Sequence, residues 1–223
     1  MQLIVQFVGM QAALTLSLFL PAGTVAWPTG WVYVAVSLIL GIAMTAWLVR
    51  HDPELLAERL TGLRRAGQKK WDKIFVAIII VGFFSWLALM GLDAARFHWS
   101  HMSILLQAIG SIFFLVSYYG FYLTFRENPY LSPAVRIQKE RGQKVVSTGP
   151  YRYVRHPMYA AFVLYIFGTA LMLGSWLGVV SGLLLIIVIA RRAVLEERTL
   201  RQELPGYDEY MAKVHHRLIP GIW

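Results

Sequence analysis

The chain contains no cysteine and few charged residues. Of its 223 residues, 57% are hydrophobic and only 15% are charged, against about a quarter in an ordinary soluble domain. The lack of cysteine excludes disulfide bonds, thiolate catalysis and iron–sulfur ligation. Acidic residues are also scarce, 12 against 21 Lys and Arg, which gives a formal net charge of +9. In so apolar a chain these cations are expected in loops that face anionic lipid, so we predict no nucleic-acid partner.

Long windows without any charge indicate membrane spans. Several run for nearly twenty residues, the length that a helix needs to cross a bilayer core of about 30 Å. A closed barrel is excluded because polar and apolar residues do not alternate in these windows. We therefore predict an all-α, polytopic transmembrane bundle. Its apolar segments are 3–20, 31–49, 74–92, 102–124 and 157–190.

The last apolar segment and the loops between segments predict the topology. Segment 157–190 is too long for one span and is interrupted by LGSWLG, so we expect a tight helical hairpin whose second arm continues into 191–203. Residues 50–73, with seven Lys and Arg, and 125–156 are strongly basic. Six crossings place these loops and both termini on the cytoplasmic side of a multi-pass protein.

We predict one integral membrane domain, residues 1–223. Four transmembrane helices occupy 1–124, and the region 125–223 holds a long loop, the hairpin and a basic tail. The N-terminal segment lacks a basic region before its apolar run, so we interpret it as a retained span and not as a signal peptide.

A cluster of cations and tyrosines begins the hairpin. The stretch GPYRYVRHPMY, residues 149–159, contains Arg152, Arg155 and His156. Its Gly-Pro pair signals a turn, and Pro157 fits the first turn of a helix. Helix N-termini favour anions, and the three cations reinforce that preference. The plain alternative is that these cations reach lipid phosphates while the tyrosines lie at the membrane interface.

A second charged cluster follows the hairpin. In RRAVLEERTL, Arg192 and Glu196 are four residues apart on one helix face, with Glu197 beside them. Such a pair usually lies on a solvated surface, but ionisable groups near membrane depth tend to face a cavity. Together with His156 they predict one cytoplasmic pocket that holds both cations and carboxylates. That combination suits a zwitterionic or cationic small molecule.

Two further patterns have structural explanations. Small residues around Gly168 to Gly178 predict close helix packing within the hairpin. His98 and His101 are three residues apart, which suits a pair of metal ligands on a helix, but they lie on the predicted outer face. We interpret them as interfacial histidines and predict no metal site.

The C-terminal motifs resemble those of a known family. RHPMY, a hydrophobic hairpin and then EE with a leucine three residues on resemble the signature of the isoprenylcysteine carboxyl methyltransferase family, which is related to the phospholipid methyltransferases. The resemblance covers roughly the C-terminal 90 residues. It implies an integral membrane enzyme that uses S-adenosyl-L-methionine from the cytosol, releases S-adenosyl-L-homocysteine, and methylates a lipidic or prenylated acceptor from the bilayer.

The resemblance also implies site residues. The catalytic residues would be Arg192, which contacts the substrate, and Glu196, which also holds the cofactor's ammonium group. His156 and nearby backbone N–H groups would meet the cofactor's carboxylate, while tyrosines enclose its adenine and sulfonium. The implied cofactor-binding residues are Gln138, Gln143, Lys144, Val145, Val146, Tyr151, His156, Pro157, Met158, Tyr159 and Glu196.

The acceptor stays open at this stage. The family's best-known reaction is carboxyl methylation of a prenylated cysteine, and a carboxylate needs only a cation such as Arg192 to orient it. Phospholipid N-methylation is the alternative, because Glu197 or His156 could take a proton from an amine. A membrane sterol-type reductase that binds NADPH has a similar architecture, but usually has Asn where this chain has Met158. A non-catalytic membrane scaffold would leave the charged rim unexplained.

Overall fold

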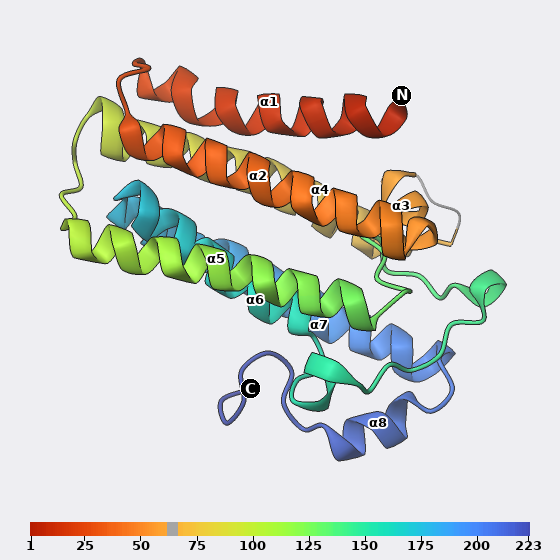
Figure 1. Ribbon diagram of the computed structural model, residues 1–223. Helices are drawn as coiled ribbons and strands as arrows, with labels where there is room; N and C mark the ends of the chain where they lie inside the picture. Colours follow the sequence, from red (N-terminus) through yellow and green to blue (C-terminus); the bar gives the residue numbers. More distant parts are fainter. Residues whose placement is uncertain (62–66) are drawn as a thin grey trace.

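The described part of the chain, residues 1–61 and 67–223, is a bundle of helices without strands in the computed structural model (Figure 1). Five helices are long and apolar enough to cross a bilayer. They are α1 (Gln2–Ala22), α2 (Pro28–His51), α4 (Lys70–Met90), α5 (Ile104–Glu127) and α7 (Trp176–Glu203). The apolar α6 (Pro157–Leu173) has 17 residues, the lower limit for a span. The prediction of an all-α, multi-pass membrane bundle is confirmed.

Short elements connect or extend the long helices. A π-helical segment continues α4, and two 3-10 turns lie between α5 and α6. Residues 50–73, predicted only as a basic loop, contain α3 and the start of α4, while their residues 62–66 lie outside the described part of the chain. The short elements are α3 (Pro53–Leu60), the π-helix (Gly91–Arg96), the 3-10 turns (Lys139–Arg141 and Gly149–Arg152) and α8 (Tyr207–Lys213).

The long helices run side by side, and one end of the bundle gathers most of the irregular chain. Figure 1 places the N-terminus, α3, the segment between α5 and α6, and α8 at this end, which we call the loop end. The side chains of Gln2 and Gln6 donate to the Leu60 carbonyl oxygen, at 3.2 and 3.0 Å. The chain therefore starts and finishes its long helices at the same end, as six crossings require.

The residues at the two ends of α6 explain why this helix begins and ends where it does. Pro157 is the first residue of α6, where its missing N–H leaves no helical bond unmade. Gly174 ends α6 with a φ of 78°, a conformation that favours glycine. The Ser175 hydroxyl then accepts a hydrogen bond of 2.8 Å from the Gly178 N–H and caps α7. Two residues therefore connect the arms, and α7 continues to Glu203, as the sequence predicts.

Glycines set close helix contacts, but not the contacts that the spacing predicts. A Cβ atom on Gly168 would lie 2.5 Å from the backbone of α5, and one on Gly178 would lie 2.6 Å from Met90 of α4. Both therefore pack the hairpin against other helices, and the prediction that this spacing joins its two arms is wrong. The arms meet at Gly182, whose added Cβ would lie 2.5 Å from Ile166.

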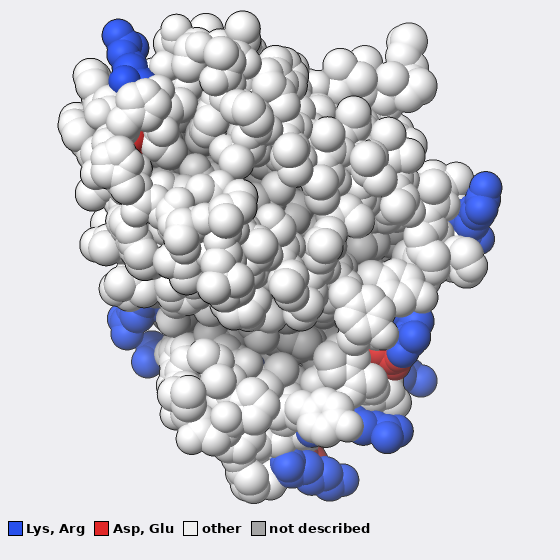
Figure 2. All heavy atoms as spheres, turned by 60° about the vertical axis from the view of Figure 1, so that its left-hand side comes forward, with Lys and Arg blue, Asp and Glu red and all other residues white. Residues whose placement is uncertain are grey.

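Apolar side chains cover the outside of the bundle as well as its core. Buried residues of all six long helices form one core cluster, so the regions 1–124 and 125–223 pack together. The face drawn in Figure 2 is almost free of charged side chains across its centre, and its Lys and Arg lie at the margins. Leu20, Ile39 and Leu184 are among large apolar residues with more than half of their surface exposed. Such a surface suits contact with lipid.

Candidate functional site

A cavity of about 290 Å³ lies at the loop end of the bundle. Its wall combines the membrane helices α4 and α7, the segment between α5 and α6, and the region of α8. Most of the site residues predicted from the sequence line it: Gln143, Lys144, Val145, Val146, Tyr151, His156, Pro157, Met158, Tyr159, Arg192 and Glu196. Residues far apart in the sequence thus share one chamber.

Gln138 is the predicted site residue that does not line this cavity. Its side chain is fully buried and donates to the Tyr130 carbonyl oxygen at 2.6 Å. Its Oε1 accepts from Arg141 at 2.9 Å, and its backbone N–H donates to Gln143 Oε1 at 2.7 Å. Gln138 therefore holds the loop in shape, while its neighbour Gln143 reaches the cavity wall.

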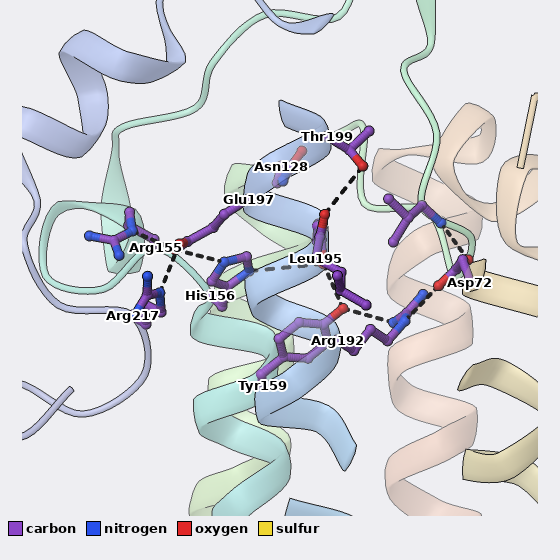
Figure 3. Close-up of polar contacts among 12 residues, drawn as sticks. Asp72, Asn128, Arg155, His156, Tyr159, Arg192, Leu195, Glu197, Thr199 and Arg217 are labelled. Carbon is purple, nitrogen blue, oxygen red and sulfur yellow. Dashed lines mark hydrogen bonds and ion pairs between the residues drawn. The ribbon is translucent and has the colours of Figure 1, made fainter. Parts of the chain in front are cut away.

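A chain of hydrogen bonds joins the two predicted catalytic residues through Tyr159. Figure 3 labels Arg192 and Tyr159 in this chain. Arg192 donates through Nη1 to the Tyr159 hydroxyl at 2.7 Å, and that hydroxyl donates to Glu196 Oε2, also at 2.7 Å. The spacing of Arg192 and Glu196 suggests a direct ion pair. In the structure the Tyr159 hydroxyl lies between them and joins them through two hydrogen bonds, an arrangement that we call the relay. Glu196 keeps 25% of its side chain exposed and lines the cavity.

Asp72 is the partner of Arg192 that sequence reasoning missed. Arg192 Nε donates to Asp72 Oδ1 at 2.8 Å, and Arg192 Nη2 donates to the Pro133 carbonyl oxygen, also at 2.8 Å. The fully buried Asp72 also accepts from the Val135 N–H at 2.8 Å and from the Gln68 side chain at 3.0 Å. One carboxylate therefore ties α4, α7 and the loop together. The sequence does contain one indication of this role, because Asp72 is an acidic residue at the start of an apolar span, where such a residue usually has a partner.

Glu197 lies at the centre of a separate cluster of cations (Figure 3). Its Oε1 accepts from Arg155 at 2.6 Å and lies 3.2 Å from His156 Nε2, while its Oε2 accepts from Arg217 at 2.7 Å. The carboxylate is buried and its charge is balanced by two guanidinium groups. The sequence suggests Glu197 as a proton acceptor for an amine, but in the structure its carboxylate binds Arg155 and Arg217 and holds them in place.

His156 lies between the two glutamates at the start of α6. Its Nδ1 is 4.0 Å from Glu196 Oε2, and its ring stacks on Tyr159 with centroids 5.4 Å apart. The backbone of residues 214–217 holds this turn: the His156 N–H donates to the Arg217 carbonyl oxygen, and Arg155 Nη1 donates to the Val214 carbonyl oxygen. Of the three cations in the opening motif, Arg155 and His156 reach the cavity, whereas Arg152 is exposed.

A group of tyrosines lines another part of the cavity. Tyr151, Tyr207 and Tyr210 belong to one buried cluster against which Val145 and Val146 pack. The Tyr151 hydroxyl accepts a 2.7 Å hydrogen bond from the Asn128 side chain. Burial raises the pKa of all three phenols, so they are neutral at physiological pH. The Tyr207 hydroxyl is buried without a hydrogen-bond partner among the described residues, which marks it as a group that a bound molecule can satisfy.

Fold and cavity together define a polytopic helical membrane protein with a cavity at the loop end of its bundle. Residues 99–205, which include α5, the loop and the hairpin, match the family described as Phospholipid methyltransferase. Two curated relatives, each named "Probable protein-S-isoprenylcysteine O-methyltransferase", come from Oryza sativa subsp. indica and Oryza sativa subsp. japonica. Each is 38% identical over 86 residues, which are 38% of this chain and 45% of the relative.

These similarities confirm the resemblance predicted from the sequence. The chain matches less than half the length of the two relatives, and the family match, residues 99–205, includes most of the residues that line the cavity. The helices α1 to α4 lie outside the family match, although α4 contributes Asp72 and an apolar part of the wall.

Proposed function

We propose that this protein is an integral membrane methyltransferase that uses S-adenosyl-L-methionine and acts on a lipidic acceptor by carboxyl O-methylation of an isoprenylcysteine-type substrate. The observation that carries the proposal is the cavity itself. It joins a partly exposed carboxylate, Glu196, and several tyrosines to apolar side chains of α4. The family match and the names of the two relatives support the reaction class.

The residues present suit the cofactor. An ionised carboxylate accepts up to about four hydrogen bonds, and one to Glu196 is made within the protein, so Glu196 retains capacity for an ammonium group. Tyr151, Tyr207 and Tyr210 of the buried tyrosine cluster line the cavity and supply aromatic rings for adenine and a sulfonium. The unpartnered hydroxyl of Tyr207 offers a further hydrogen bond. The volume, about 290 Å³, is near the lower end of ligand pockets, roughly 300–1,000 Å³.

The α4 side of the cavity suits a lipid chain. Val76, Ile79 and Ile80 line it, and they belong to a helix that is long and apolar enough to cross the bilayer. An isoprenoid or acyl chain buried against such side chains gains roughly 25 cal/mol for each Å² of apolar surface removed from water. We propose that the acceptor's tail lies here and that its headgroup points to Tyr159 and Arg192. We propose that this end faces the cytosol, because basic loops favour the cytoplasmic side of a membrane.

The site chemistry favours a carboxylate acceptor over an amine. An amine must lose a proton. Of the two candidate acceptors, Glu197 is engaged by Arg155 and Arg217, and His156 Nε2 lies 3.2 Å from Glu197 Oε1. A carboxylate needs no base because it is already nucleophilic. Arg192, held by Asp72 and Pro133, would border and orient such an acceptor. Phospholipid amines remain the competing acceptor class.

The protein's contribution to the reaction is positioning. When bound, S-adenosyl-L-methionine supplies a methyl group activated on a sulfonium. Glu196 and His156 fix the position of the donor, while the relay through Tyr159 fixes the position of Arg192 relative to them. Because the transfer is an in-line displacement, correct alignment of donor and acceptor supplies much of the acceleration. The apolar wall keeps water away from the reacting atoms.

Calorimetric titration of the detergent-purified protein with S-adenosyl-L-homocysteine tests the proposal. We expect micromolar binding that weakens at least tenfold in Glu196→Gln, because a charge-assisted contact to the ammonium is lost. Glu209→Gln is the matched control, since Glu209 is exposed on α8 and does not line the cavity. Equal affinities in Glu196→Gln and in the wild type would refute the assignment of the cofactor carboxylate.

A parallel titration and a transfer assay separate the alternatives. NADPH binding in place of S-adenosyl-L-homocysteine binding would favour a reductase and overturn the proposal. Transfer of labelled methyl from S-adenosyl-L-methionine is then measured to N-acetyl-S-farnesylcysteine and to phosphatidylethanolamine. We expect the first to be methylated, and Arg192→Gln to reduce its turnover with little change in S-adenosyl-L-homocysteine affinity. Methylation of the second alone would assign the protein to amine acceptors.

A further inference from the structure

The arginines that line the cavity differ in whether the protein supplies a carboxylate partner. Three of them do have one: Arg136 with Glu58 and Glu140, Arg155 with Glu197, and Arg192 with Asp72. Arg59, which also lines the cavity, forms no ion pair with any carboxylate in residues 1–61 and 67–223. Residues 62–66 are Gly-Leu-Arg-Arg-Ala and contain no acid.

Arg59 is held in place by groups that leave its charge unmatched. Its Nη1 donates to the Leu131 carbonyl oxygen at 3.2 Å, and its guanidinium lies 4.6 Å from the centre of the Phe125 ring. Burial lowers the pKa of Arg59 to about 10, so the side chain is still protonated at neutral pH. A guanidinium has five N–H donors. Arg59 thus retains donors that can meet a ligand.

Arg59 lies near the proposed methyl-acceptor position. Arg59 donates to the carbonyl of Leu131, and Arg192 donates to the carbonyl of Pro133, two residues further along the same loop. The Cα atoms of these two loop residues are at most about 7.6 Å apart, because consecutive Cα atoms are 3.8 Å apart. Both guanidinium groups therefore border one short stretch of the cavity wall. The apolar α4 residues Val76 and Ile80 line the same cavity.

A partly buried cation without a counter-ion favours an anionic ligand. The cost of removing a charge from water is offset when an opposite charge with good geometry joins it. A guanidinium binds carboxylate and phosphate groups through two parallel hydrogen bonds. Arg192 is less suited to this role because the fully buried Asp72 already matches its charge.

We propose that Arg59 binds the anionic headgroup of the lipidic acceptor, a carboxylate or a phosphate, and thereby selects acceptors with a negative charge. The proposal rests on the methyltransferase function proposed above. It assigns to α3, outside the family match, a part in choosing the acceptor. Arg192 then positions the reacting group beside Tyr159, and Arg59 supplies the charge that attracts it.

Binding of a matched acid and amide tests the proposal. The ligands are N-acetyl-S-farnesylcysteine and its carboxamide, which has a similar shape but no charge, titrated into the full-length protein in detergent. We expect the wild type to bind the acid about tenfold more tightly than the amide, and Arg59→Gln to bind both within about twofold. The control is Arg50→Gln, because Arg50 is exposed at the end of α2 and does not line the cavity. It should keep the wild-type ratio.

A second variant and a second ligand keep the outcomes distinct. Arg59→Lys retains the charge but not the forked geometry, so it should keep a reduced preference for the acid even if Arg59→Gln fails to fold. Phosphatidylethanolamine titrated in parallel shows whether a phosphate depends on Arg59 in place of a carboxylate.

Failure of this proposal differs from failure of the proposed function. If S-adenosyl-L-homocysteine binds but the acid preference is unchanged in both Arg59 variants, the role of Arg59 is overturned and the methyltransferase proposal stands. If S-adenosyl-L-homocysteine does not bind while an anionic ligand still depends on Arg59, the anion site stands and the methyltransferase proposal is overturned.

Discussion

Replacing Asp72 with alanine is expected to destabilise the protein strongly, because it leaves a buried guanidinium without its partner. The Asp72 side chain is fully buried, and that of Arg192 is only 10% exposed. Breaking a buried ion pair by removing one partner costs about 3–5 kcal/mol. The Val135 N–H, which donates to Asp72 at 2.8 Å, also loses its partner and adds about 1–3 kcal/mol. We therefore expect a loss on the order of 5 kcal/mol in the free energy of unfolding.

A double variant tests the reason for this loss. Asp72→Ala combined with Arg192→Met removes the stranded charge, so it should be more stable than Asp72→Ala alone by about 1–3 kcal/mol. Unfolding in mixed micelles, followed by tryptophan fluorescence, measures each stability.

The matched control for this prediction is Asp208→Ala. Asp208 pairs with Arg201 at 2.7 Å, but both side chains are more than half exposed, and such pairs contribute less than about 1 kcal/mol. Equal losses in Asp72→Ala and Asp208→Ala would refute the reasoning. Strict additivity of the two changes in the double variant would show that Asp72 and Arg192 do not act as a pair.

Three further predictions follow from the packing and the polar contacts. Gly168→Ala should lower the thermal stability by several degrees, since its Cβ would lie 2.5 Å from the backbone of α5, whereas Gly9→Ala, with no atom within 4 Å, should not. Glu197→Gln should increase proteolysis of residues 214–223, because it weakens the contacts that hold Arg155 and Arg217; unchanged cleavage rates would contradict this. Tyr159→Phe removes the hydroxyl that joins Arg192 to Glu196, so Arg192→Gln should lower acceptor turnover less in a Tyr159→Phe background than in the wild type. The turnover numbers of Tyr159→Phe, Arg192→Gln and the double variant measure this.

Much of the fold could be predicted from the sequence because its signals are local. Charge-free windows set the spans, and the residues that begin and end α6, Pro157 and Gly174, act on their own backbone. The close packing of Gly168 could not be assigned in this way. Small residues show that some helix comes near, but they do not show which one, and here it is α5 and not the second arm of the hairpin.

In the candidate site too, residues within local motifs were predicted from the sequence, whereas contacts between distant residues were not. The cavity residues from Gln143 to Tyr159 were placed by motifs, and they line one chamber. The partner of Arg192 was missed because the helical spacing pointed to Glu196, four residues away, whereas Asp72 lies 120 residues away in the sequence. Gln138 was placed in the cavity because a motif gives a position in the chain and not the direction of a side chain. Such contacts depend on the folded path of the whole loop.

The backbone contacts between residues 214–217 and the His156 turn imply an order of assembly. The Arg155 and His156 N–H groups donate to the carbonyls of His216 and Arg217, which follow α7 in the chain and are synthesised after all of it. His156 therefore lacks these backbone contacts until the residues after α7 have been made and have folded back onto the start of α6. A released chain truncated just before Val214 keeps all six long helices but loses these carbonyl acceptors, so it should form the helical bundle with an unfinished ligand site.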